Sequence, residues 1–279
     1  MYARDVMTAP VFIVSPQDTV AYARNLMIKH KISRVLVMRD EKPVGIITKK
    51  DIGYGLVRQS PAWKRRPLDQ MPVETLAVKD PFVVAPDTGI REIARLFVQK
   101  NISCAPVVED GRVAGIVTKT DLMKSALVAA LPGVAGDVME DVATVSRYHS
   151  LDHVIKVMSG RNDKVVVTES DGTIAGIITE TNLAFSDKSP VKSMVVGKDV
   201  KRVVLANTQK SSGQVSLSGE HVTAEDVMTK PVTTITPDCP LTDAIALMGR
   251  LHINSLVVME NKTISGILKR DDIIKEVAK

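Results

Sequence analysis

The sequence has few aromatic residues, few cysteines and no long apolar run. Phe, Trp and Tyr make up 3% of the 279 residues, whereas hydrophobic residues make up 44%, so the core must consist mainly of aliphatic side chains. No apolar stretch reaches the roughly 18 residues that a membrane-spanning helix needs, and the N-terminal residues show no apolar signal core. These absences predict an aliphatic α/β core and a soluble, cytoplasmic protein that does not enter a membrane.

The cysteines and the net charge set further limits. Cys104 and Cys239 lie far apart in the sequence, which favours buried, reduced thiols over a disulfide in a cytosolic protein. The net charge is +5 and the pI is about 9.1, which mildly favours anionic partners such as nucleotides or nucleic acid. A charge this small is more often simply a basic, soluble surface.

Sequence motifs of common enzyme classes are also missing. There is no Gly-x-x-x-x-Gly-Lys-Ser/Thr loop, no Gly-x-Gly-x-x-Gly fingerprint and no Gly-x-Ser-x-Gly elbow. His149 and His153 are four residues apart, but the residues between them lack the Glu of zinc proteases, so surface histidines are a better interpretation than a metal site. We therefore expect no catalytic residues, no catalytic cofactor and no metal.

The sequence contains instead one phrase that occurs four times. Its form, Gly-Ile-Ile-Thr-x-x-Asp, is typical of a buried strand that runs into the first turn of a helix. The copies that begin at Gly45 and Gly115 are 70 residues apart without a gap, and the last begins at Gly266. The copy at Gly176 comes one residue early and ends in Asn182 instead of Asp. Because the spacing is long and varied, the copies indicate repeated domains rather than a solenoid.

Each copy lies within the same predicted order of elements, β-α-β-β-α. In the first repeat we expect strands at 11–14, 35–38 and 44–48, a helix that ends at His30, and a second helix from Asp51 onward. In the later repeats the first helix carries apolar residues at i, i+3, i+4 and i+7, which predicts one buried face. These residues are Ile90, Ile93, Ala94 and Phe97; Leu151, Val154, Ile155 and Met158; and Leu241, Ala244, Ile245 and Met248.

Further phrases connect the repeats to a known family. The first repeat has Asp-Val-Met-Thr at 5–8, Ser-Pro-Gln-Asp-Thr at 15–19 and Lys-Ile-Ser-Arg-Val-Leu-Val at 31–37. With the phrase above, they make the chain resemble four CBS (cystathionine β-synthase) domains over nearly its whole length. The resemblance implies two tandem Bateman modules, each formed by two repeats that pair with pseudo-two-fold symmetry and leave crevices between their sheets. Since the family often forms discs of two modules, one chain here could complete a disc.

The repeats divide the chain as follows: repeat one at 1–57, repeat two at 73–131, repeat three at 132–187 and repeat four at 223–279. Residues 58–72 form a basic linker, which we interpret as an exposed connector, with nucleic-acid contact as the weaker alternative. The insert at 188–222 has strand character at 201–205 and 214–217 and predicts an added hairpin.

Three aspartates at the ends of the repeated phrases are the candidate ligand-binding residues: Asp51, Asp121 and Asp272. The simplest interpretation is that each caps the helix that follows it, since a carboxylate before a helix accepts backbone N–H groups. A carboxylate at a helix N-terminus can also accept two hydroxyl groups from a ribose. The resemblance implies this second role, with the neighbouring hydroxyl and basic residues bound to phosphate and the base held between apolar residues.

The resemblance assigns the remaining positions as follows. The phosphate-binding candidates are Ser33, Arg34, Thr48, Ser103, Thr118 and Lys269. The adenine-pocket candidates are Pro10, Val11, Ile32, Asp80, Pro81, Ile102, Pro231, Val232 and Ile253.

The four sites are not equivalent in sequence. Repeat one has Arg34, which can form paired hydrogen bonds with a phosphate, and Cys104 replaces it in repeat two. Repeat three has Thr179 and Asn182, and an Asn lacks both the charge and the second acceptor oxygen. We expect this third site to be degenerate. We expect removal of a buried aspartate ligand, Asp51 or Asp121, to weaken nucleotide binding about tenfold or more.

These observations predict a ligand sensor rather than an enzyme. The expected ligand is an adenine nucleotide, AMP, ADP or ATP, and the expected output is a signal to an unknown effector protein or a change in oligomeric state, including a possible homodimer. An S-adenosylmethionine or methylthioadenosine ligand is one alternative within this class. A nucleic-acid-associated regulator that binds through the basic linker is a second alternative.

Overall fold

The computed structural model describes residues 1–58, 67–158, 163–185 and 222–279. It confirms the predicted α/β class, with four small sheets and helices packed around them. The predicted hairpin of the insert and most of the basic linker lie outside the described residues. None of the described helices combines the length and the apolarity that are needed to cross a bilayer.

Repeats one and two follow the predicted order of elements. Repeat one contains α1 (Ala3–Val6), β1 (Ile13–Val14), α2 (Val20–Lys29), β2 (Arg34–Arg39), β3 (Lys42–Thr48) and α3 (Lys49–Arg58). Two 3-10 turns, η2 (Leu68–Gln70) and η3 (Val73–Thr75), lead into β4 (Val78–Lys79), α4 (Ile90–Gln99), β5 (Cys104–Glu109), β6 (Arg112–Thr118), α5 (Lys119–Met123) and α6 (Ala126–Ala129). The first strand is parallel to the second, which is antiparallel to the third, and in repeat two a single bridge between Val84 and Val107 replaces that first strand.

Repeats three and four are built in the same way. Repeat three contains α7 (Ala135–Val138), β7 (Ala143–Ser146), α8 (Leu151–Met158), β8 (Lys164–Thr168), β9 (Ile174–Thr179) and α9 (Glu180–Phe185). Repeat four contains α10 (Ala224–Val227), β10 (Thr234–Ile235), α11 (Leu241–Leu251), β11 (Ser255–Glu260), β12 (Thr263–Lys269) and α12 (Arg270–Ala278).

The predicted apolar faces form the core. In α4, Ile90, Ile93, Ala94 and Phe97 are all buried, and Phe97 has no exposed surface. Burial of a face this regular stabilises the helix by about 1.5–3 kcal/mol for each large side chain. Of the two cysteines, Cys104 is buried as expected, but Cys239 is partly exposed, so the prediction of two buried thiols is wrong for Cys239.

The segment that opens each repeat crosses to the sheet of its neighbour. Lys79 of repeat two pairs with Gly45, and Thr8 of repeat one pairs with Ile116. The glycine of the repeated phrase makes this approach possible: a Cβ on Gly115 would lie 2.7 Å from the Met7 sulfur. Repeats three and four exchange opening segments in the same way, through the bridges Glu140–Ile267 and Thr229–Ile177. The crossings pair the repeats into two modules, as the resemblance implied.

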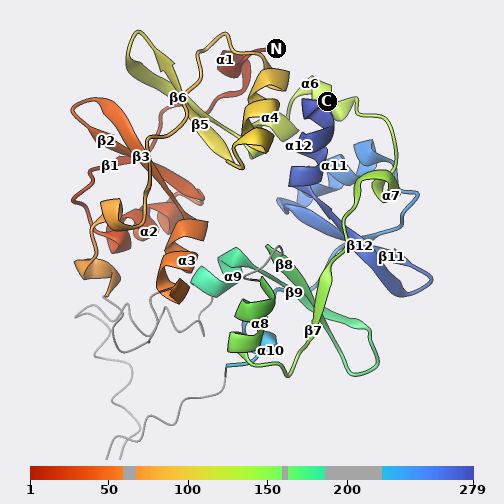
Figure 1. The fold of residues 1–279 in the computed structure, drawn as a ribbon. Coiled ribbons are helices and arrows are strands. Elements are labelled where there is room, and N and C mark those ends of the chain that lie inside the picture. The colour runs from red at the N-terminus through yellow and green to blue at the C-terminus, as the bar shows by residue number, and fades with distance from the viewer. Residues whose placement is uncertain (59–66, 159–162, 186–221) are drawn as a thin grey trace, which may run out of the picture.

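The two modules join through their helices into one ring. Figure 1 shows the four sheets around a common centre, with α3 beside α9 and α4 beside α12. One hydrophobic cluster continues from Phe97 of repeat two to Ile273 and Val277 of repeat four. The guanidinium of Arg95 on α4 donates hydrogen bonds to the carbonyls of Ala278 and Lys279. A single chain therefore forms the disc of two modules.

Candidate functional site

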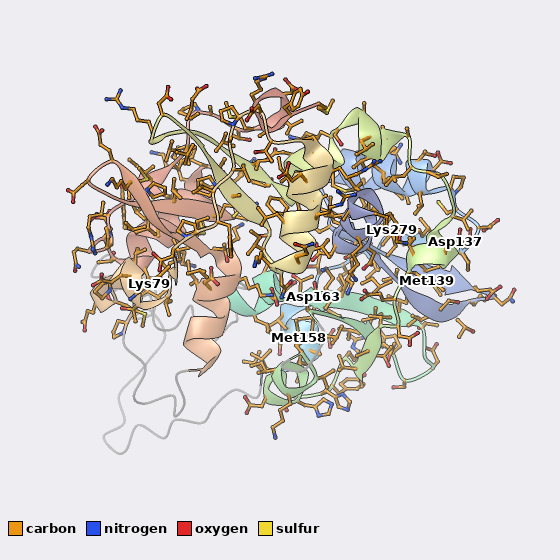
Figure 2. All side chains as sticks on the ribbon, turned by 45° about the horizontal axis from the view of Figure 1, so that its top comes forward. Lys79, Asp137, Met139, Met158, Asp163 and Lys279 are labelled. Atoms are coloured by element: carbon orange, nitrogen blue, oxygen red, sulfur yellow. The ribbon has the colours of Figure 1, made fainter. Side chains whose placement is uncertain are left out.

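A cavity of about 1330 Å³ lies where the four repeats meet. Every repeat contributes to its wall, which carries nine Lys or Arg residues and six Asp or Glu residues. Figure 2 places Asp163, one of the lining residues, near the middle of the molecule. An excess of positive charge in a partly enclosed space favours anionic ligands.

The cavity wall contains many of the sequence-predicted site residues. Those that line it are Ser33, Arg34, Thr48, Asp51, Asp80, Pro81, Ile102, Ser103, Thr179, Asn182, Pro231, Val232 and Ile253. Those that do not line it are Pro10, Val11, Ile32, Thr118, Asp121, Lys269 and Asp272. The division follows the repeats: the cavity reaches the helix starts of repeats one and three that carry Asp51 and Asn182, but not Asp121 or Asp272.

The four capping sites share one local geometry. Thr118 caps α5, and Asp121 is the third helical residue, with one carboxylate oxygen that accepts from the Thr118 N–H at 2.9 Å and from its hydroxyl at 2.7 Å. Asp51 accepts from Thr48 in the same way, at 2.8 and 2.7 Å. The expectation that the aspartate precedes the helix is therefore wrong. The cap occupies one oxygen, and the second oxygen distinguishes the four sites.

Asp51 lines the cavity and keeps one carboxylate oxygen without a partner in the described part of the chain. Among the described residues, Asp51 bonds only with Thr48, so its other oxygen remains available to a ligand. Burial raises the pKa of this carboxyl group above its ordinary value, although the Thr48 hydrogen bonds oppose that shift.

Repeat two supplies the opposite wall at Asp51. This wall consists of Asp80 and Pro81 on the crossing segment and of Ile102 and Ser103 before β5. We call this space the Asp51 crevice. Because the opening segments exchange, this crevice contains residues of both repeats. Sequence reasoning also missed two residues of this wall, Phe82 and Lys100, whose ring and ammonium group lie 5.1 Å apart.

Asp121 faces the opening segment of repeat one. Its second oxygen accepts a long hydrogen bond of 3.5 Å from the Thr8 hydroxyl and lies 3.9 Å from the Lys124 ammonium. The side chain is buried, with 5% exposure. A ribose at Asp121 would have to displace these neighbours.

Asn182 uses its whole amide within the protein. Its oxygen accepts from the N–H and hydroxyl of Thr179, at 2.9 and 2.7 Å. Its NH₂ group donates to the Val227 carbonyl at 2.9 Å and to the Thr229 hydroxyl at 2.8 Å. Both donors and both acceptor positions are therefore satisfied. Asn182 ties the opening segment of repeat four to α9 and has no group left for a ribose.

Asp272 lies in an ion-pair cluster. Glu140, from the opening segment of repeat three, bonds Lys269 at 2.6 Å and also pairs with Lys275. Lys275 in turn lies 3.2 Å from Asp272, which is 2% exposed. We call Glu140, Lys269, Asp272 and Lys275 the latch. In this arrangement Lys269, a predicted phosphate ligand, is bound to a carboxylate of the same chain.

The two carboxyl groups of the latch have opposite pKa shifts. Hydrogen bonds from Lys269 and Lys275 lower the pKa of Glu140 to about 2. Burial raises the pKa of Asp272 to about 6, and the nearby negative charge of Glu140 adds to this increase. The charge on one carboxyl group opposes ionisation of the other, so Glu140 ionises first and Asp272 ionises at a higher pH.

Comparison with known families identifies all four repeats. The family model for the CBS domain matches residues 3–53, 73–127, 135–187 and 224–279. These segments contain the four copies of the repeated phrase and the crossing segments that open the repeats.

Related proteins share the four-repeat architecture. Protein MJ1225 of Methanocaldococcus jannaschii is 25% identical over 96% of this chain and 95% of its own length. Its crystal structure, described as a candidate archaeal homolog of g-AMPK, covers 99% of both chains with a TM-score of 0.77 at 22% identity. A conserved protein from Pyrococcus horikoshii covers 99% of this chain with a TM-score of 0.64 at 19% identity. At these identities the structures show a common fold only.

Other relatives are longer than this chain. An inosine-5'-monophosphate dehydrogenase of Thermoplasma acidophilum is 26% identical over 193 residues, which are 64% of this chain but 39% of the enzyme. Protein MJ1404 of Methanocaldococcus jannaschii matches 99% of this chain at 24% identity, and the match spans 61% of that protein. The chain thus spans only part of these relatives.

Proposed function

The chain belongs to the CBS-domain family, and from this premise we propose that it is a regulatory protein that binds an adenine nucleotide in the Asp51 crevice. The observation that carries the proposal is the state of the second carboxylate oxygen at the four equivalent positions. Of these four positions, only Asp51 both lines the cavity and has a carboxylate oxygen without a partner among the described residues. The ribose would bond to this oxygen, because a carboxylate accepts from vicinal hydroxyl groups.

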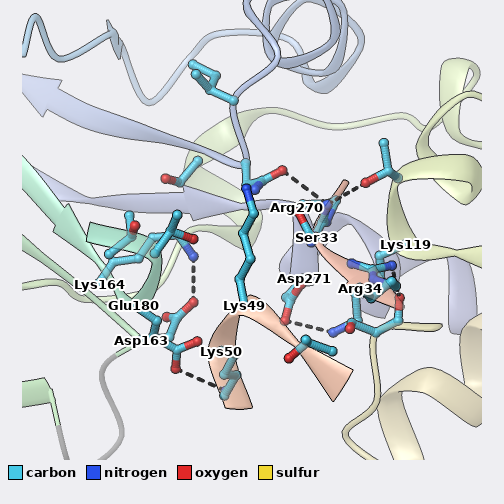
Figure 3. Close-up of a pocket in the computed structure, with 18 of the residues that line it drawn as sticks. Ser33, Arg34, Lys49, Lys50, Lys119, Asp163, Lys164, Glu180, Arg270 and Asp271 are labelled. Atoms are coloured by element: carbon cyan, nitrogen blue, oxygen red, sulfur yellow. Dashed lines mark hydrogen bonds and ion pairs between the residues drawn. The ribbon is translucent and has the colours of Figure 1, made fainter. Parts of the chain in front are cut away.

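The walls of the crevice fit the rest of a nucleotide. Pro81 and Ile102 offer apolar surface to a purine base, and Phe82 adds an exposed ring at the entrance. Ser103 and Arg34 line the same cavity, and Figure 3 shows Arg34 beside Lys119. The cationic excess of the wall favours the phosphates of AMP, ADP or ATP over S-adenosylmethionine, whose sulfonium is positively charged. S-Adenosylmethionine and methylthioadenosine remain the alternative ligands that the binding experiment must include.

Signalling would follow from the construction of the crevice. One wall belongs to α3 of repeat one and the other to the opening segment of repeat two. A ligand that contacts both walls favours the arrangement of the repeats that it fits, which is a population shift. We propose that an effector protein reads this shift in the cytoplasm and that the chain itself is not an enzyme. Since one chain completes the disc, formation of the disc requires no homodimer.

The experiment that tests this function is calorimetric titration with ATP, ADP, AMP, S-adenosylmethionine and methylthioadenosine. We expect an adenine nucleotide to bind the wild type and Asp51→Asn to weaken binding about tenfold or more. Asp121→Asn is the matched control, since it makes the same change at an equivalent helix position outside the cavity. A ligand present at a hundred times its dissociation constant should also stabilise the protein by about 2.7 kcal/mol.

Two results would contradict the proposal. One is the absence of binding by any of the five compounds. The other is equal weakening by Asp51→Asn and Asp121→Asn, because the open oxygen would then not distinguish the two positions. Tighter binding of S-adenosylmethionine than of all three nucleotides would replace the nucleotide with the alternative ligand.

A further inference from the structure

The crevice at Asn182 has a less charged wall than the Asp51 crevice. We call the part of the cavity between Asn182 of repeat three and the adjoining wall of repeat four the Asn182 crevice. The wall of repeat four consists of Pro231, Val232, Thr233 and Ile253. At the equivalent positions of repeat four, Pro231 and Leu251 replace the charged residues Asp80 and Lys100 of the wall at Asp51. These replacements leave apolar side chains where the first crevice has a carboxylate and an ammonium group.

The cavity also reaches the first helix of repeat four, α11. Three residues of α11 line the cavity, whereas the equivalent residues of α4 in repeat two do not. The former are Ile245, Met248 and Gly249, and the latter are Ala94, Phe97 and Val98. A Cβ atom on Gly249 would have no heavy atom within 4 Å, so this position is open where repeat two has a valine side chain. The apolar wall of the Asn182 crevice therefore extends along α11, which the Asp51 crevice does not do along α4.

Two polar side chains of this crevice are available to a ligand. Within the described residues, neither the Thr233 hydroxyl nor the imidazole of His252, which also lines the cavity, has a hydrogen-bond partner. The backbone at the end of α11 does not require a histidine, because Asn101 has a similar left-handed φ at the equivalent position, 50° against 54°. Asn182 itself uses its oxygen and both amide hydrogens within the protein. The crevice therefore offers a hydroxyl and an imidazole, but no carboxylate at the position where Asp51 would bind a ribose.

We propose that the Asn182 crevice binds an uncharged aromatic molecule without a ribose, as a second ligand besides the nucleotide. Pro231, Val232 and Ile253 bury its ring, since removal of apolar surface from water stabilises the complex. Thr233 or His252 bonds a polar atom at the ring edge, and an apolar wall with few polar groups is the usual composition of a small-molecule site. A charged ligand is disfavoured, because it would lose hydration at this wall without gaining an ion pair.

A ligand in the Asn182 crevice would act on the second module. It contacts the opening segment of repeat four, which Asn182 ties to α9 of repeat three through the Val227 carbonyl and the Thr229 hydroxyl. The ligand thus favours the pairing of repeats three and four that it fits. A nucleotide at Asp51 acts in the same way on repeats one and two, so the chain would respond to two ligands of different chemistry, one in each module. Binding at Asn182 does not require binding at Asp51.

Calorimetric titration with indole, without and with saturating ATP, tests this site in the full chain. Indole is planar and uncharged and carries one N–H donor. We expect Ile253→Ala, which removes apolar contact, and Gly249→Val, which fills the open position, each to weaken indole binding about tenfold or more. Ile102→Ala is the matched control, since it makes the same change at the equivalent position of the Asp51 crevice, and should alter indole binding less than about twofold. Gly249 is exposed, so its variant should fold even if Ile253→Ala does not.

Competition separates this site from the nucleotide site. Simultaneous binding of indole and ATP supports two crevices with different ligands, whereas displacement of indole by ATP or by adenosine overturns the assignment. Absence of indole binding, or unchanged binding in both Ile253→Ala and Gly249→Val, also overturns it, even if Asp51→Asn still weakens ATP and the proposed function stands. Conversely, indole binding that depends on Ile253 in a protein that binds no nucleotide retains the aromatic site and rejects the nucleotide function.

Discussion

The Asp51 crevice and the latch are built from the same sequence phrase but have opposite states. In the crevice, repeat two places the uncharged Val78 opposite Ile46, and the carboxylate of Asp51 keeps an open oxygen. In the latch, repeat three places Glu140 at the equivalent position, opposite β12, and its carboxylate binds the lysines around Asp272. The residue that the partner repeat brings to the helix start thus decides whether the position is open or closed. The four repeats share one fold, and the residue that the paired repeat contributes makes their sites differ.

Loss of the latch carboxylate should have the largest effect on stability. Glu140→Ala leaves Lys269, which is 15% exposed, without its bond of 2.6 Å and with only the Asp163 carboxylate at 3.6 Å. We expect the free energy of unfolding to fall by about 1–3 kcal/mol, because a partly buried cation loses its nearer partner. Urea denaturation measures this change. Glu109→Ala, at the exposed end of β5, should change the free energy by less than about 0.5 kcal/mol; equal losses in the two variants would show that the latch contributes nothing.

Transfer of the latch charge to the open crevice should reduce binding. Val78→Glu places a carboxylate at the position that Glu140 holds in the other module, in the wall of the cavity. We expect nucleotide affinity to fall about tenfold, that is about 1.4 kcal/mol, because a negative charge is added near the phosphates. Val78→Gln separates the change in polarity from the added charge and should show a smaller decrease in the same titration. If both variants bind as the wild type does, the residue opposite Ile46 does not control the crevice.

The third site gives a test in which a carboxylate is introduced. Asn182→Asp places a second carboxylate oxygen toward the Val227 carbonyl, where the amide now donates at 2.9 Å. We expect a loss of about 1 kcal/mol in the free energy of unfolding, because a donor is replaced by an acceptor that faces another acceptor. Thermal unfolding of the variant and of Asn182→Ala at pH 7 measures the difference. A more stable Asp variant would mean that Asn182 does not tie the two segments together.

The latch should also give a small dependence of stability on pH. The folded-state pKa of Asp272, about 6, lies above its ordinary value of 3.8, so its contribution is present at low pH and is lost as the pH rises from about 4 to 6. Glu140, with a pKa of about 2, contributes the opposite slope, but below pH 4.5. Between pH 4 and 6.5 the melting temperature of the wild type should therefore fall by about 2–4 °C relative to Asp272→Asn. Parallel curves for the two proteins would contradict the raised pKa of Asp272.

The sequence predicted the repeats because they depend on local patterns. The order β-α-β-β-α, the buried face of α4 and the pairing of Thr48 with Asp51 all follow from spacings of a few residues. The aspartates were placed correctly at helix starts, although inside the first turn rather than before it.

The state of each site depended on distant residues, and sequence reasoning missed it. Glu140 meets Lys269 across 129 positions, and Arg270 meets Thr120 across 150. No local pattern shows which opening segment crosses to which sheet, so the residues that share one crevice could not be matched from the sequence. One signal was available: the series Thr8, Val78, Glu140 and Thr229 occupies equivalent positions with three different residue types. A difference of this kind in an otherwise repeated phrase indicates different roles.

Because the ring closes within one polypeptide, formation of the disc does not depend on protein concentration. When separate chains must associate to make such a disc, dilution favours dissociation, and the midpoint of any ligand response shifts with protein abundance. Here Arg95 of α4 and the last turn of α12 hold the two modules together intramolecularly. The ligand concentration that half-saturates the protein should therefore be the same in a cell that makes few copies and in one that makes many.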